Sequence, residues 1–356
     1  MLLRFLKNWT LPSAIALGTV LYLLFARVPA LRPAADILGP LCETLLPVSI
    51  FLTLFVTFSK VDFHLMRLRR WHIIILLLQL LLTVLLTAAI LLVRYTSDGH
   101  SLFTLHSSLF HSFNLSIFQS FNLSIFQSFN LSIFQSFNLS ASLEAVLVCV
   151  IAPCASASPV VTAKLGGDLT QMTTFVLLSS LVTSLLIPAV FPILEPREGA
   201  TFLSAFLLIL QRLATVLLFP LLLGSVVRHW VKPLYQWFLR TPDLGFYLWS
   251  VSLAITSGIT VKNILHSSAA LGLLLAIAAL TLLTAVIQFR LGRLVGHSTG
   301  EPICTGQAMF QKNTGLAIWI AYIYLTPISS IGAGCYVLWQ NIINSCELWY
   351  VRRSAK

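Results

Sequence analysis

Long apolar runs, separated by short segments that carry the polar and charged residues, account for most of this sequence. A helix needs about 20 apolar residues to cross the hydrocarbon layer of a membrane. The runs predict ten transmembrane helices, at residues 11–27, 35–58, 71–94, 142–165, 168–194, 200–227, 244–262, 267–290, 302–326 and 328–350. The pattern therefore indicates an all-α polytopic membrane protein, with a single transmembrane domain over residues 1–356.

The composition agrees with this fold class. Hydrophobic residues make up 58% of the chain and charged residues 9%, whereas an average soluble domain is about 25% charged. The net charge of +11 does not indicate nucleic-acid binding, because the basic residues lie in short segments between the apolar runs rather than on one face. We expect membrane lipid and no nucleic acid among its partners, and the oligomeric state stays open.

Lysine and arginine residues concentrate in alternate segments of the chain. With a cytoplasmic N-terminus, the inner segments hold fifteen of them and the outer segments hold five, namely Arg27, Arg32, Arg94, Arg197 and Lys262. Positive loop charge favours the cytoplasmic side of a membrane. We therefore expect a multi-pass protein of the bacterial inner membrane, with both the N- and the C-terminus in the cytoplasm.

An octad repeat occupies the predicted outer loop between the third and fourth helices. The sequence SFNLSIFQ occurs in three full copies from Ser112 to Gln135 and fades by Leu143. Solenoid repeats are usually 20 to 50 residues long and diverge from copy to copy. We interpret residues 112–143 as a low-complexity insert from a recent duplication, and the sequence leaves open whether it is ordered.

Two of the predicted helices contain interruptions. In the fourth, Pro153 and Pro159 flank small residues, so the chain must unwind near Ala155 to Ser158. In the ninth, a polar cluster stands where apolar residues are expected: Gly306, Gln307, Gln311, Lys312, Asn313, Thr314 and Gly315. Unwound backbone at membrane depth must line a protein cavity. Each interruption alone fits a proline kink or a small-residue packing seam. Together, five helices apart, they predict two inverted five-helix repeats whose broken helices cross at the midplane, as in secondary transporters.

At these interruptions the chain resembles the bile acid:sodium symporter family. The resemblance rests on the run from Pro153 to Thr162 with Gly167-Asp168, on the run from Ala308 to Ala317, and on Trp339-Gln-Asn341. It implies a core of helices 3–5 and 8–10, a panel of helices 1, 2, 6 and 7, and alternating-access transport of organic anions, either bile-acid-like or small carboxylates, together with sodium.

The sequence departs from that family at the sodium ligands. The positions that match one sodium site are Ser158, Pro159, Met172, Val176 and Ala308, and only Ser158 among them offers a side-chain oxygen. Sodium, a hard cation, needs several oxygen ligands. We expect no cofactor, and these losses argue against sodium as the coupling ion, which leaves a proton or no ion as the alternatives.

Lys312 carries the sharpest sequence hypothesis, because an ionisable residue at membrane depth costs about 2.5 to 3.5 kcal/mol and is usually functional. Lys312, which follows Gln311, stands where the resemblance would place the second sodium site. Its ammonium would replace sodium and donate to Gln79 and to helix 4 carbonyls, beside Ser158. Alternatively, Lys312 loads and releases a proton, or it snorkels to the membrane boundary and serves no function.

The resemblance also implies a substrate site. Asn313, Gln340 and Asn341 match cavity residues whose amides would bind a carboxylate or sulfonate, and Ser158 and Thr162 complete the predicted set. The alternative is that these amides make ordinary hydrogen bonds between helices.

No sequence motif indicates an enzyme. The chain contains no HExxH motif, no CxxC pair and no close His-Asp pair at helical spacing. We therefore predict a secondary transporter. A transport-dead membrane sensor or scaffold, and a transporter of another inverted-repeat family, stay open as alternatives.

Overall fold

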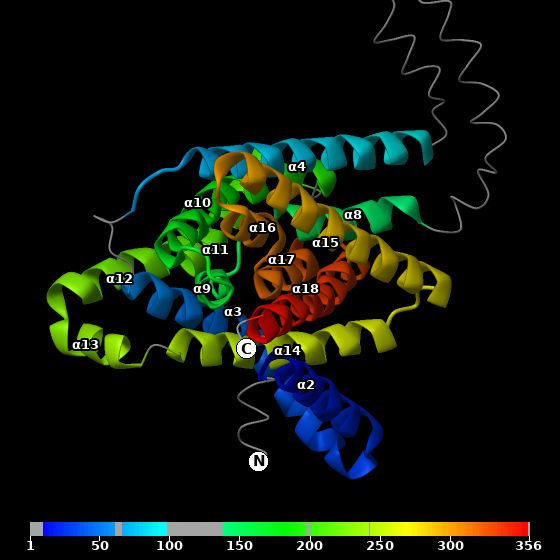
Figure 1. Cartoon of the computed structure of the whole chain (residues 1–356). Coiled ribbons are helices and arrows are strands. Elements are labelled where there is room, and N and C mark those ends of the chain that lie inside the picture. The colour runs from blue at the N-terminus through cyan, green and yellow to red at the C-terminus, as the bar shows by residue number, and fades with distance from the viewer. Residues whose placement is uncertain are drawn as a thin grey trace, which may run out of the picture.

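The chain folds as a bundle of helices (Figure 1). The computed structural model describes residues 10–60, 66–97, 138–196, 199, 201–241 and 243–354. Within these ranges the secondary structure is helical and contains no strand. The octad insert lies outside the described residues, apart from positions 138–143.

The first half of the chain contains α2 (Thr10–Arg27), the 3-10 turn η1 (Pro29–Leu31), α3 (Arg32–Ser59), α4 (Arg70–Ser97), α8 (Leu139–Ile151), α9 (Ser158–Lys164) and α10 (Leu169–Leu194). The second half contains α11 (Phe202–Leu213), the π-helical turn η3 (Ala214–Leu218), α12 (Phe219–Trp230), α13 (Lys232–Arg240), α14 (Leu244–Leu265), α15 (Leu271–Thr299), α16 (Pro302–Phe310), α17 (Thr314–Tyr324) and α18 (Pro327–Ser354).

Six helical segments of the described chain are long and apolar enough to cross a membrane: Ile37–Ser59, Arg70–Thr96, Leu169–Leu194, Phe202–Trp230, Leu244–Leu265 and Leu271–Thr299. Shorter apolar helices cover Pro12–Arg27, Leu139–Ile151 and Thr314–Tyr324. The predicted fold class is confirmed at this level, as an all-helical, multi-pass membrane protein.

Local sequence explains where several of these helices begin. Asp168 caps α10, because its carboxylate accepts hydrogen bonds from the amides of Thr170 at 2.8 Å and Gln171 at 3.0 Å. Proline stands in the first turn of α9 and of α16, where its missing N–H costs nothing. At the other end of a helix, α15 stops at Gly300, which has a φ of +80°.

The helices pack in two groups. In one, called the α14 group, α14 lies against α2 and α3, and α12 lies against α3. In the other, called the α15 group, α15 packs on α16, α18 and α8, while α4 packs on α8 and α17 packs on α18. The groups meet where α14 contacts α18 and α17, and where α3 contacts α17.

A close contact between α18 and α14 joins the two groups. A Cβ added to Gly334 of α18 would lie 2.3 Å from Cγ2 of Thr260 in α14, so only glycine fits at that position. Nearby, Asn263 of α14 donates its side-chain amide to the hydroxyl of Ser330 in α18 at 3.0 Å.

Candidate functional site

Two interrupted helices meet near the middle of the bundle. Helix α8 ends at Ile151 and α9 begins at Ser158, while α16 ends at Phe310 and α17 begins at Thr314. Both interruptions were predicted, and the first one starts a few residues earlier than expected. Between these helices, Cys154 lies opposite Lys312 in an isolated antiparallel bridge.

The bridge pairs backbone groups that the helices leave free. The Ala155 amide donates to the Gln311 carbonyl at 2.9 Å, and the Asn313 amide donates to the Pro153 carbonyl at 2.8 Å. Unpaired backbone groups buried at membrane depth cost several kcal/mol each. Backbone groups freed by one interruption therefore pair with backbone groups freed by the other.

Gln340 of α18 holds the same crossing from a third helix. Its Oε1 accepts from the Lys312 amide at 3.0 Å, and its Nε2 donates to the Lys312 carbonyl at 3.3 Å and to the Thr314 hydroxyl at 3.4 Å. Gln340 is 1% exposed. In this structure its amide binds protein backbone, which is the alternative that the sequence left open for it.

Lys312 is fully buried, with 1% of its surface exposed, so its side chain does not snorkel to a membrane boundary. The Gln79 amide donates to the carbonyls of Ile151 at 3.2 Å and Ala152 at 3.1 Å. Among the described residues, Gln79 Oε1 and Lys312 Nζ both lack a hydrogen-bond partner, so the predicted hydrogen bonds of the ammonium to Gln79 and to helix 4 carbonyls are not present.

The other predicted residues of the crossing are also buried. Both side-chain polar atoms of Gln311 and the hydroxyl of Thr162 lack a hydrogen-bond partner within the described chain. Ser158 lies at the start of α9, where its Oγ accepts from the Cys154 thiol at 3.2 Å. The crossing thus contains several buried polar atoms that have no hydrogen-bond partner in the described chain.

Asn313 and Asn341 have different surroundings. Asn313 caps α17 through its Oδ1, which accepts from the Leu316 amide at 3.2 Å, and it lines a cavity. Asn341 donates to the Val337 carbonyl of its own helix at 2.7 Å and does not line that cavity. Of these two predicted substrate residues, only Asn313 lines the cavity.

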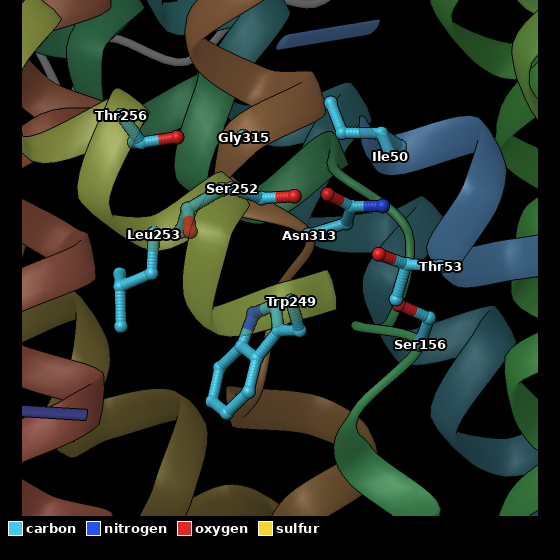
Figure 2. A pocket seen from close by; sticks show the side chains of 10 residues that line it. Ile50, Thr53, Ser156, Trp249, Ser252, Leu253, Thr256, Asn313 and Gly315 are labelled. Carbon is cyan, nitrogen blue, oxygen red and sulfur yellow. The ribbon is translucent and has the colours of Figure 1, made fainter. Parts of the chain in front are cut away.

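A cavity lies beside the crossing, between the two helix groups (Figure 2). The space amounts to about 320 Å³, counting the part open to solvent. Its lining comes from α3, α14, the α8–α9 interruption and the start of α17: Ile50, Thr53, Ser156, Trp249, Ser252, Leu253, Thr256, Asn313, Thr314 and Gly315. These side chains offer hydroxyls, one amide and one indole, and none of them is charged.

Thr256 stands out among the cavity residues. The other buried hydroxyls of α14 donate to the carbonyl four residues earlier, namely Ser250, Ser252, Ser257 and Thr260. Thr256 is 2% exposed, and its hydroxyl has no partner in the described part of the chain. Its Oγ1 would lie 3.5 Å from a Cβ placed on Gly315. It is therefore a buried hydroxyl positioned opposite α17 and available to a ligand.

Sequence reasoning did not identify the cavity residues of α3 and α14. Serine and threonine are common in these helices, and the hydrogen bonds of most of them are satisfied by their own helix. Only the packing of the two groups distinguishes Thr53 and Thr256 from their neighbours. A small-residue pattern along α14 was the one signal available.

A buried ion pair was also missed. Glu144, near the start of α8, is 2% exposed and accepts from Arg94 of α4 at 2.8 Å and from Ser329 of α18 at 2.8 Å. Arg94 also contacts Glu195 at 2.5 Å and the Leu194 carbonyl. This network ties α4, α8, α10 and α18 together at one end of the α15 group.

No group of three or more metal-ligating side chains occurs in the described ranges.

A family model described as the Sodium Bile acid symporter family matches residues 79–291, which is more than half of the 356 residues. The match includes the α8–α9 interruption and ends before the α16–α17 interruption. Comparison with curated proteins finds no match.

Proposed function

The chain belongs to the sodium bile acid symporter family, and we propose that it is a secondary active transporter that moves a small organic anion by alternating access. Members of this family are membrane transporters rather than enzymes. The observation that carries the proposal is the pair of interrupted helices joined through their backbones beside a cavity. Discontinuous helices of this kind form substrate sites in secondary transporters.

The cavity suits an anion with several hydrogen-bonding groups. Asn313 and the first turn of α17 present an amide and backbone N–H groups, and the helix dipole favours negative charge there. Thr256 contributes a free hydroxyl from the opposite wall. In this conformation the enclosed part of the cavity has room for little more than a water molecule, so an anion would enter only when the two helix groups move apart.

The residues at the matching sodium positions do not fit a sodium ion. Met172, Val176 and Ala308 are fully buried and belong to one hydrophobic cluster, so they supply no oxygen. Ser158 offers a hydroxyl that already accepts from a thiol. In this proposal the ammonium of Lys312 supplies a fixed positive charge at the crossing, and transport does not depend on sodium.

The proposal extends to the arrangement in the membrane. The α15 group would act as the core and the α14 group as the panel of ten spans in two inverted repeats. The Lys and Arg distribution supports cytoplasmic N- and C-termini in a bacterial inner membrane. The interface between the groups, at Gly334 and Thr260, would open and close as the core moves.

The test is uptake of labelled anions into proteoliposomes, with pyruvate and taurocholate as the two probes. Each is measured with and without an inward sodium gradient, at several pH values. Sodium-independent uptake of pyruvate supports the proposal, and dependence on a proton gradient would identify the proton as the driving ion. Uptake that requires sodium contradicts the role of Lys312.

A second candidate function is a membrane sensor that binds an anion without transporting it. The missing sodium ligands favour it, because a transporter that loses its coupling ion loses its driving force. Equilibrium binding of labelled pyruvate to the purified protein, without uptake by the same preparation, would favour the sensor over the transporter.

A further inference from the structure

The helix α13, between α12 and α14, lies across one end of the bundle (Figure 1). One face of this nine-residue helix packs on the protein. Phe238 is 3% exposed and lies in a cluster with Val56 of α3 and Val227 of α12, against which Leu234 and Tyr235 also pack. The helix is therefore fixed to the α14 group along its apolar side.

Two exposed tryptophans lie in this part of the chain, one at the end of α12 and one in α13. Trp230, at the end of α12, is 80% exposed, and Trp237 is 49% exposed. Both lie at the end of a membrane-length helical segment, Phe202–Trp230, or just beyond it. Tryptophan is enriched at the level of lipid headgroups, where its ring is apolar and its N–H is polar. Two exposed tryptophans at the end of a spanning segment are the residues expected of a helix at the membrane surface.

Basic residues occur in the same part of the chain. Segment 228–243 carries Arg228, Lys232 and Arg240, against one acidic residue, Asp243. Lys232 and Arg240, at the two ends of α13, are exposed. Lys60, at the end of α3, reaches the same place and donates to the Thr241 carbonyl at 2.9 Å. The surface of α13 therefore combines positive charge with exposed tryptophan.

We propose that α13 and the end of α12 bind the headgroups of anionic phospholipids in the adjacent leaflet. An amphipathic helix with basic residues and tryptophan on its free face lies in the interface and is attracted to anionic lipid. The site is separate from the cavity, and it stands whether or not the protein transports an anion.

The experiment uses the full chain, reconstituted in phosphatidylcholine vesicles with trace spin-labelled lipid. Electron spin resonance gives the fraction of each labelled lipid immobilised by the protein, and hence its relative association constant. Phosphatidylglycerol should bind at least fivefold more tightly than phosphatidylcholine, which is the effect of about one Lys or Arg near a membrane surface. The double variant Lys232→Gln/Arg240→Gln should lower that ratio to near one.

The matched control is Arg290→Gln/Arg353→Gln, which removes the same charge from exposed sites on α15 and α18. It should keep the native ratio. High salt, about 1 M, shortens the Debye length to about 3 Å and should remove the preference in the native protein. Equal binding of both lipids by the native protein, or equal losses in both double variants, overturns the proposal.

Discussion

Replacing Lys312 by methionine should make the protein more stable. The native side chain is 1% exposed, and its ammonium has no hydrogen-bond partner among the described residues. Insertion of a lysine at membrane depth costs about 2.5 to 3.5 kcal/mol. Methionine has a similar length and adapts to irregular spaces, so Lys312→Met should recover about 2 to 3 kcal/mol of that cost.

The assay is thermal unfolding of the purified protein in detergent, and the measured quantity is the amount of folded protein that remains after heating. For a chain of this size, each kcal/mol of added stability raises the unfolding midpoint by about 2 °C or more. The midpoint of Lys312→Met should therefore rise by roughly 5 °C. Lys164→Met is the control, because Lys164 is exposed at the end of α9 and, within the described residues, makes only a cation–π contact with Phe246 at 4.5 Å. At about 0.5 to 1 kcal/mol for such an exposed contact, its replacement should lower the midpoint by no more than about 2 °C.

The outcome that refutes the reasoning is destabilisation. If Lys312→Met lowers the free energy of unfolding by 2 kcal/mol or more, the ammonium is satisfied in the native protein, for example by ordered water. The same variant should lose uptake if the fixed charge at the crossing is needed for transport. Higher stability together with lost uptake would show that the buried charge is retained for function.

Three further predictions concern neighbouring residues. Gln340→Leu leaves the buried amide of Lys312 unsatisfied and should destabilise the protein by about 1 to 3 kcal/mol, measured in the same unfolding assay, and an unchanged midpoint would contradict its role at the crossing. Thr256→Val removes the free hydroxyl without changing the shape of the side chain, so the KM of anion uptake should rise about fivefold while the unfolding midpoint stays constant. Thr256→Ser keeps a hydroxyl and should restore the KM. Gly334→Ala brings a Cβ against Thr260 and should destabilise the protein by about 1 to 3 kcal/mol, and a fully tolerated substitution would contradict the tight contact.

The sequence predicts the interruptions well because they have local causes. Pro153 follows the end of α8 and Pro159 stands in the first turn of α9, so neither fits inside one continuous helix, and the polar residues around Lys312 are incompatible with lipid. The number of residues between the interruptions does not reveal which backbone groups pair. That pairing depends on how the helices cross, so the sequence could not show that the Gln79 amide donates to the carbonyls of Ile151 and Ala152.

Other features depend on packing that no local pattern encodes. Thr256 resembles the other hydroxyl residues of α14 in sequence, and only the position of α17 makes it different. Glu144 falls at the edge of an apolar run, and its partner Arg94 belongs to a different helix. The nine residues of α13 follow a charged turn and contain a proline, a pattern that is also typical of a loop.

The backbone pairing between Ala155 and Gln311 also constrains how the protein is made. The two segments are separated by α9 to α16 in the chain, so the unwound end of α8 enters the membrane long before its partner is synthesised. During that time its carbonyl and amide groups need water, another segment or the insertion machinery as temporary partners. A ribosome that stalls before residue 311 would leave a chain whose backbone groups near Ala155 are unpaired at membrane depth. Such truncated chains should be substrates for membrane quality-control proteases, whereas the complete chain should resist them.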